Sequence, residues 1–239
     1  MKNFISYPKQ QKIAFWSGIF VLLSSVFFIT FAMVFQGFFG YEKSTNSYYI
    51  KFHEVFGVFV HLLYYTSLTN IFLGVMLLLV AYKPESEKVK IWFFNSVVLI
   101  TITFFIYWGL ISWTQKWNKI HSVISSLVTH CVNPVLGFIV LFLMRRQIKV
   151  SFKNIYSLSL IVVAYFFFAM FVYLGSGSQY DFKNGAIIYS FLHFYRPFFI
   201  KTSSVGLIVT LDLLLFVIAF LAPAGLGFAW KAILKIKTK

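Results

Sequence analysis

Three side chains in apolar stretches of this 239-residue sequence could together carry out nucleophilic catalysis: Thr66, His130 and Asp212. A hydroxyl group becomes an effective nucleophile when an adjacent base takes its proton, and a histidine base needs a third group to fix its tautomer. The residue types therefore suggest Thr66 as nucleophile, His130 as general base and Asp212 as the group that orients the imidazole.

Pro134 follows His130 by four residues. Because proline has no N–H to donate to the carbonyl four residues earlier, we expect a kink that opens space beside the imidazole. The kink would also leave the His130 carbonyl for water or a substrate. Four polar residues lie one helical turn from Thr66 or His130 and are expected to line the same substrate pocket: Thr69, Asn70, Ser126 and Asn133.

The overall composition places these polar residues in a membrane. Hydrophobic residues make up 60% of the chain and charged residues 11%, with a mean hydropathy of +0.83, against roughly 45–50% and 25% in soluble domains. A soluble domain of this size could not cover its surface with so few charges while hiding 32 Phe. Composition thus excludes a soluble enzyme, a disordered chain and a nucleic-acid-binding domain.

Six stretches nearly free of charge predict an all-α fold, a polytopic bundle of six transmembrane helices forming a single domain over residues 1–239. Each stretch is at least 25 residues long, which exceeds the ~20 residues that a helix needs to cross hydrocarbon. Within them, only Asp212 carries a formal charge. The predicted spans are residues 13–41, 55–82, 91–115, 120–144, 154–180 and 202–230.

The distribution of Lys and Arg predicts the orientation. The segments 1–12, 83–90, 145–153 and 231–239 hold 14 basic residues, and the segments 42–54, 116–119 and 181–201 hold 7. This bias places both termini in the cytoplasm and the basic ends against anionic membrane lipid. Abundant Phe, Lys and Ile with few Arg are typical of an AT-rich bacterial genome, so we expect a bacterial cell membrane. Residues 181–201 are expected to form a short interfacial helix that ends before Pro197.

The three candidate residues fall at one depth in this arrangement. Thr66, His130 and Asp212 are the eleventh or twelfth residues of helices that run from outside to inside, so all three lie ~15–18 Å below the outer boundary. A structural interpretation of each stays open: Thr66 can bond its own backbone, His130 a neighbouring helix, and Asp212 can be protonated and packed.

The sequence gives no reason to expect a cofactor or a metal ion. Cys131 is the one cysteine, and the acidic residues are few and dispersed. Haem would need two histidines facing each other, and the deepest pair, His61 and His130, differs in depth by several ångströms.

The segment Tyr-Tyr-Thr-Ser-Leu-Thr-Asn-Ile at 64–71, followed by His130 and Pro134, resembles a six-span membrane family. This is the family of the androgen-induced proteins and the androgen-dependent TFPI-regulating protein, with bacterial relatives. The resemblance implies six helices with cytoplasmic termini and a membrane threonine hydrolase that cleaves fatty acid esters of hydroxy fatty acids. It assigns the nucleophile to Thr66 and the base to His130, and it has no counterpart of Asp212. The Thr-to-His separation is shorter here, and a pair of histidines before the proline is reduced to one.

The leading hypothesis is therefore an intramembrane hydrolase of a lipid-like ester, with an acyl intermediate on Thr66 and a substrate that arrives laterally from the membrane. A transporter or lipid-binding membrane protein could use the same polar cavity without chemistry. A structural subunit of a complex is the third hypothesis, and the oligomeric state is left open.

Overall fold

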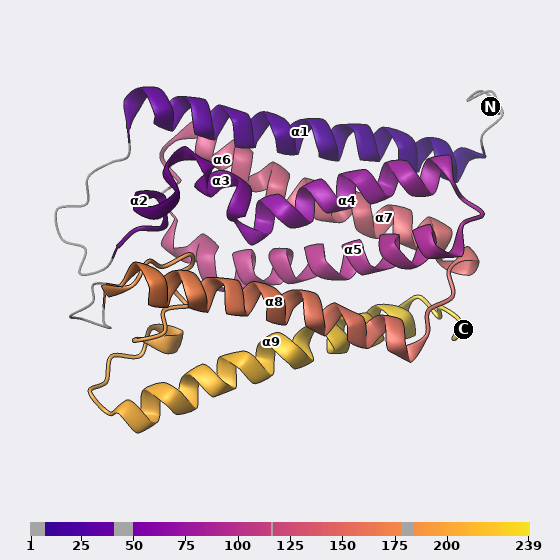
Figure 1. Ribbon diagram of the computed structural model, residues 1–239. Helices are drawn as coiled ribbons and strands as arrows, with labels where there is room; N and C mark the ends of the chain where they lie inside the picture. The colour runs from indigo at the N-terminus through magenta and orange to yellow at the C-terminus, as the bar shows by residue number, and fades with distance from the viewer. Residues whose placement is uncertain (1–7, 41–49, 116, 178–183) are drawn as a thin grey trace. The chain divides into compact units, whose positions relative to one another are not determined.

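The computed structural model describes residues 8–40, 50–115, 117–177 and 184–239 (Figure 1). Across these ranges the chain is mainly helical and contains no strand, only two isolated bridges. Six segments are long and apolar enough to cross a membrane: Lys9–Phe39, Phe52–Tyr82, Glu87–Ile111, Ile120–Gln147, Phe152–Ser176 and Val205–Ile233. The predicted all-α, six-span membrane fold is confirmed. Residues 41–49, 116 and 178–183, which fall in or next to the segments predicted to lie outside, are not among the described residues.

The chain divides into two compact units. Unit 1 comprises residues 1–29, 65–158 and 223–239, and unit 2 comprises residues 30–64 and 159–222. Three long helices contribute residues to both units: α1 (Lys9–Phe39), α8 (Phe152–Ser176) and α9 (Val205–Ile233).

Unit 1 is built around α5 (Glu87–Ile106), the most buried of the six spans. It packs against α4 (Tyr65–Tyr82) and α7 (Asn133–Met144). Fully buried side chains from these helices form the core: Leu73, Leu77, Phe93, Phe94, Ile100, Leu141 and Met144. Because this continuous apolar core contains no charged residue, the helices that form it appear in the sequence as uninterrupted hydrophobic stretches.

Helix α1 contacts α4 through small residues. Its buried side chains are Ala14, Ser17, Gly18, Val21 and Ser25. A Cβ atom on Gly74 of α4 would lie 3.0 Å from the backbone nitrogen of Leu22. Because nothing larger than glycine fits at such a contact without movement, the α1 and α4 backbones approach each other closely, as is common between membrane helices.

Unit 2 has an aromatic core. Side chains from α2 (Phe52–Phe56), α3 (Val60–Leu63), α8, α9 and the segment 184–204 make one cluster. Its buried members include Phe52, Val60, Phe166, Tyr173, Ile188, Phe194 and Leu215. Phe166 meets the rings of Phe194 and Phe216 edge to face, with 5.5 and 5.8 Å between centroids, an arrangement that aromatic quadrupoles favour.

The interfacial helix predicted for residues 181–201, ending before Pro197, is not present in the described part of that segment, which begins at residue 184. Residues 185–196 form turns and bends, and the short 3₁₀ turn Pro197–Phe199 begins at the proline. The Ala186 N–H donates to Ser176 Oγ and the Ile187 N–H to the Ile50 carbonyl. These bonds pull the apolar side chains of the segment into the aromatic core instead of arranging them along one helical face.

The second span, predicted to be continuous over 55–82, is interrupted twice. A 3₁₀ turn, Gly57–Phe59, separates α2 from α3, and Tyr64 adopts an extended conformation (φ −63°, ψ 136°) between α3 and α4. The Tyr165 hydroxyl donates to the Leu63 carbonyl at 3.0 Å. This bond satisfies a carbonyl that the break at Tyr64 leaves without a helical N–H partner.

Candidate functional site

Thr66 is the second residue of α4, because that helix begins at Tyr65, directly after the break. The sequence placed it in the middle of a continuous helix. Its side chain is half-buried. In the first turn of any α-helix the backbone N–H groups have no partner inside the helix, and the helix dipole is positive there. The threonine hydroxyl thus lies beside backbone donors that can stabilise negative charge.

His130 lies in a π-helical turn, Val128–Val132, between α6 (Ile120–Leu127) and α7. Such turns occur often at functional sites. As expected from Pro134, the His130 carbonyl receives no helical bond from residue 134. Its partner is the Trp108 indole, whose Nε1–H donates at 2.9 Å. The freed carbonyl was therefore predicted correctly, but a protein side chain occupies it instead of water or a substrate.

The imidazole of His130 is held by stacking. The ring of Tyr107 lies parallel to it, with 3.7 Å between centroids and 4° between planes. Tyr107 therefore fills space that the sequence predicted to be open on that side. Within the described residues, His130 Nδ1 is buried and has no hydrogen-bond partner. The ring is thus fixed in place while one nitrogen stays unbonded.

Asn70 joins the first turn of α4 to the π turn. Its Nδ2 group donates to the Thr66 carbonyl at 2.9 Å and to the Thr129 carbonyl at 3.1 Å. Its Oδ1 accepts from Asn133 Nδ2 at 2.8 Å. Both asparagines are almost completely buried. A single amide therefore bonds to Thr66 and to the residue before His130.

Two other predicted pocket residues also bond to protein groups. The Thr69 and Thr103 hydroxyls are 2.9 Å apart. Gln115 Nε2 donates to Ser126 Oγ at 2.8 Å, and Gln115 Oε1 accepts from the Tyr107 hydroxyl. Thr69, Asn70, Ser126 and Asn133 thus belong to a hydrogen-bonded layer across unit 1. Their contact with a substrate remains a prediction.

Asp212, the third candidate catalytic residue, lies on α9 in unit 2, whereas Thr66 and His130 belong to unit 1. Its Oδ1 atom is buried and, among the described residues, has no hydrogen-bond partner. Its role in orienting His130 remains a prediction. The other deep histidine, His61, also belongs to unit 2 and bonds to Gln36 through Nε2.

No three His, Cys, Asp or Glu side chains gather into a possible metal site in the part of the chain that the structure describes. Cys131 follows His130 in the π turn and is partly buried as a free thiol. Besides this thiol, the site carries the hydroxyl, imidazole, amide and phenol groups described above.

An open apolar groove of about 550 Å³ lies along α1. Val128, the first residue of the π turn, forms part of its wall, and Ser24 lines it while donating to Asn133 Oδ1 at 3.4 Å. The groove therefore runs from the exposed apolar face of α1 to the hydrogen-bonded layer. The remaining lining residues are Trp16, Ile19, Phe20, Leu23, Phe27 and Phe28.

Sequence reasoning missed Tyr107, Gln115 and the inward hydrogen bond of Trp108. A depth comparison could have found Tyr107, because eight residues separate it from the outer end of the predicted third span, residue 115. That is ~12 Å, close to the depth predicted for His130. No sequence pattern distinguishes an indole that bonds a neighbouring helix from one that contacts headgroups.

Comparison with models of known families, with curated proteins and with solved structures finds no match to this chain. The resemblance at residues 64–71 and 130–134 therefore remains an expectation.

Proposed function

We propose that this multi-pass membrane protein is an intramembrane hydrolase of a lipid-like ester, with Thr66 as nucleophile and His130 as general base. The observation that carries the proposal is the Asn70 amide, which bonds the carbonyls of Thr66 and Thr129. This bridge brings the hydroxyl-bearing turn next to the imidazole-bearing turn. His130 also retains an unbonded Nδ1 atom in the described structure, as a base requires.

In the proposed reaction, Thr66 Oγ attacks the ester carbonyl carbon while its proton passes to His130. The carbonyl oxygen becomes an oxyanion, which backbone N–H groups in the first turn of α4 can stabilise. His130 returns the proton to the departing alkoxide, leaving an acyl group on Thr66. Water, deprotonated by His130, then releases the carboxylic acid and restores the hydroxyl.

The groove along α1 supports a substrate with an acyl chain. It is open and apolar, and Val128 and Ser24 connect it to the polar layer. The acyl chain of a substrate could lie in this groove at the depth where the acyl chains of membrane lipids lie. Such a substrate would reach the site laterally, without leaving the hydrocarbon.

Activity of the purified protein on p-nitrophenyl acyl esters, together with labelling by a fluorophosphonate probe, tests the proposal. We expect Thr66→Ala to abolish both hydrolysis and labelling and Thr66→Ser to retain part of each, because serine keeps the nucleophilic hydroxyl. Thr210→Ala is the matched control, since the Thr210 hydroxyl donates to the carbonyl of Gly206 in its own helix. Wild-type hydrolysis by folded Thr66→Ala protein would refute the proposal.

A second candidate function is lipid binding or transport without chemistry. The groove favours it, as does the buried carboxylate of Asp212, since ionisable groups within membrane spans commonly line ion or substrate paths. Uptake of a labelled lipid into proteoliposomes distinguishes this function. We expect it to depend on the proton gradient and to be lost in Asp212→Asn, while probe labelling of Thr66 is absent.

We further propose that the protein lies in a bacterial cell membrane with both termini in the cytoplasm. The support is the two-to-one excess of Lys and Arg on the segments assigned to the inside. Single cysteines at positions 44 and 86, introduced as Ser44→Cys and Ser86→Cys in a Cys131→Ser background, test it. An impermeant maleimide added to intact cells should label only the first. Labelling of both would overturn the orientation.

A further inference from the structure

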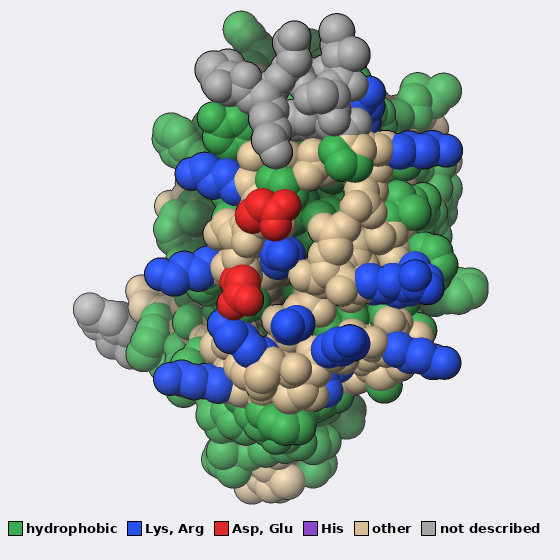
Figure 2. Space-filling model, turned by 90° about the vertical axis from the view of Figure 1, so that its right-hand side faces the viewer, with side chains coloured by type: hydrophobic (Ala, Val, Ile, Leu, Met, Phe, Trp, Pro, Cys, Tyr) green, Lys and Arg blue, Asp and Glu red, His purple; other side chains and the backbone are tan. Residues whose placement is uncertain are grey.

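One end of unit 1 carries a strong excess of positive charge. Three segments lie at this end: residues 83–90 with 3 basic residues, residues 145–153 with 4 and residues 231–239 with 4. The only acidic residues in the sequence of unit 1 are Glu85 and Glu87. Figure 2 shows this face covered by Lys and Arg side chains with few acidic ones among them.

Backbone pairing holds some of these lysines in fixed positions. Lys149 and Lys237 form a parallel bridge, in which the Val150 N–H donates to the Lys237 carbonyl at 3.1 Å. Burial alternates along both segments. Four apolar side chains are buried: Ile148, Val150, Leu234 and Ile236. The lysines between or beside them, Lys149, Lys235 and Lys237, are exposed.

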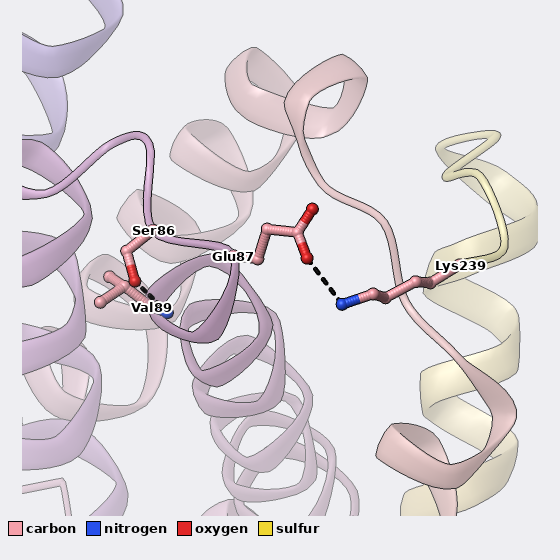
Figure 3. A network of polar contacts seen from close by, with 4 residues as sticks. All are labelled: Ser86, Glu87, Val89 and Lys239. Carbon is pink, nitrogen blue, oxygen red and sulfur yellow. Dashed lines mark hydrogen bonds and ion pairs between the residues drawn. The ribbon is translucent and has the colours of Figure 1, made fainter.

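This arrangement holds like charges together. Side chains directly opposite in a bridge lie close to each other, and two like charges there destabilise the pairing. The nearby carboxylate of Glu87 offsets this repulsion only in part: it forms its ion pair with Lys239 at 2.6 Å (Figure 3) and interacts electrostatically with Lys149 without an ion pair. Among the described residues, no acidic side chain forms an ion pair with Lys149, Lys235 or Lys237. The site is therefore complementary to an anion with several oxygen acceptors.

We propose that Lys149, Lys235 and Lys237 form a binding site for the phosphate groups of anionic membrane lipids. The three lysines lie directly beyond the ends of membrane-spanning segments, at Gln147 and Ile233, where lipid headgroups are located. Lysines near a membrane surface each strengthen contact with anionic lipid. The site goes beyond the proposed hydrolase activity and does not depend on it.

Lipid-dependent stabilisation of the full-length protein tests this site. The protein is purified in a neutral detergent, and its thermal unfolding midpoint is followed as phosphatidylglycerol or phosphatidylcholine is added. The test variant carries Lys149→Gln, Lys235→Gln and Lys237→Gln. The matched control carries Lys12→Gln, Lys83→Gln and Lys88→Gln, which remove the same charge from the basic end without touching the bridge.

We expect phosphatidylglycerol, but not phosphatidylcholine, to raise the unfolding midpoint of the wild-type protein and the control. The apparent affinity of the test variant for phosphatidylglycerol should fall by about 100-fold. A triple Lys→Arg variant at positions 149, 235 and 237 should retain most of the wild-type response, which separates lost charge from misfolding.

Three results would overturn the proposal. Equal losses in the test variant and the control would indicate diffuse electrostatic attraction without a site. Equal stabilisation by inorganic phosphate, at the same phosphate concentration, would indicate a site for a soluble anion. An unchanged response in the test variant would exclude these lysines altogether.

Discussion

Unit 1 and unit 2 bury their polar and apolar groups in different ways. In unit 1, amides and hydroxyls on different helices bond to one another, as Asn70 does to Asn133 and Thr69 to Thr103. In unit 2, the interior is an aromatic cluster. Directional bonds can set the geometry of reacting groups, whereas aromatic packing mainly sets shape. The difference therefore favours unit 1 as the place for chemistry.

The two units should also respond differently to the substitution of a buried side chain. Deleting a ring from the aromatic cluster leaves a cavity, whereas deleting an amide from the hydrogen-bonded layer leaves other polar groups without partners. Four experiments can sharpen or break this comparison.

The largest effect is expected from Phe194→Ala in unit 2. The Phe194 ring is 4% exposed and contacts Phe166 and Tyr173. Loss of the ring should lower the free energy of unfolding by about 3–5 kcal/mol, as for other buried phenylalanines. Unfolding in mixed micelles measures it, with Phe199→Ala as the control because that ring is 51% exposed. Equal losses in both variants would contradict a packed aromatic core.

Asn70→Leu should lower the free energy of unfolding by about 1–3 kcal/mol, because it removes the partners of the Thr129 carbonyl and of Asn133 Nδ2. The same micelle assay measures it. The double variant Asn70→Leu/Asn133→Leu should lose less than two independent substitutions would, since the second change removes a group already without its partner. Strict additivity would indicate that the two asparagines do not act together.

Acidification should destabilise unit 2 through His193. Burial, assisted by Arg196, lowers the pKa of His193 to about 4, from the usual 6.5. As pH falls, the unfolded chain therefore takes up this proton first, so stability is full above pH 6.5 and is lost between pH 6.5 and 4.

Between pH 7.5 and 5 the loss should reach about 2 kcal/mol, given about 1.4 kcal/mol per pH unit. The measurement compares thermal unfolding of wild-type protein and His193→Asn, which keeps an acceptor for the Tyr195 N–H. His121→Asn, an exposed histidine, serves as the control. An identical pH dependence in wild type and His193→Asn would show that His193 is not responsible.

The smallest effect is expected from Lys239→Gln, which removes the ion pair with Glu87. Both side chains are more than half exposed, and exposed pairs contribute little to stability. We expect no measurable change in the unfolding midpoint at 150 mM salt. A clear destabilisation would mean that polar bonds at the surface of unit 1 matter as much as those of its buried layer.

The positions of the six spans could be predicted because each depends on a local property, a long run of apolar residues. Pro134 likewise predicted the freed His130 carbonyl, because a missing N–H is a property of one residue. The break at Tyr64 could not be predicted in this way. Neither proline nor glycine occupies that position, and the Leu63 carbonyl beside it bonds to a hydroxyl 102 residues away in the sequence.

In the candidate site, too, local properties could be predicted from the sequence and long-range contacts could not. Thr66, His130, Asn70 and Asn133 were identified because polar residues are costly in hydrocarbon and therefore conspicuous in the sequence. Tyr107 was not, although its predicted depth is close to that of His130. Its position against the imidazole depends on how the π-helical turn that follows α5, Tyr107–Ile111, packs against the turn Val128–Val132, which no local pattern specifies. Residues 181–201 were assigned a helix from their own composition, whereas contacts with the aromatic core determine the conformation of the described part of this segment.

The π turn at Val128–Val132 has a consequence for changes in chain length. Such a turn contains one residue more than an α-helical turn occupying the same place. Removing one residue elsewhere in a span would rotate everything beyond it by about 100°, but removing Cys131 could be absorbed by converting the wide turn to an ordinary one. Helices α6 and α7 would then keep their rotation about the helix axis, and only the placement of His130 would change. This span thus contains a position where a deletion could separate the fold from the chemistry.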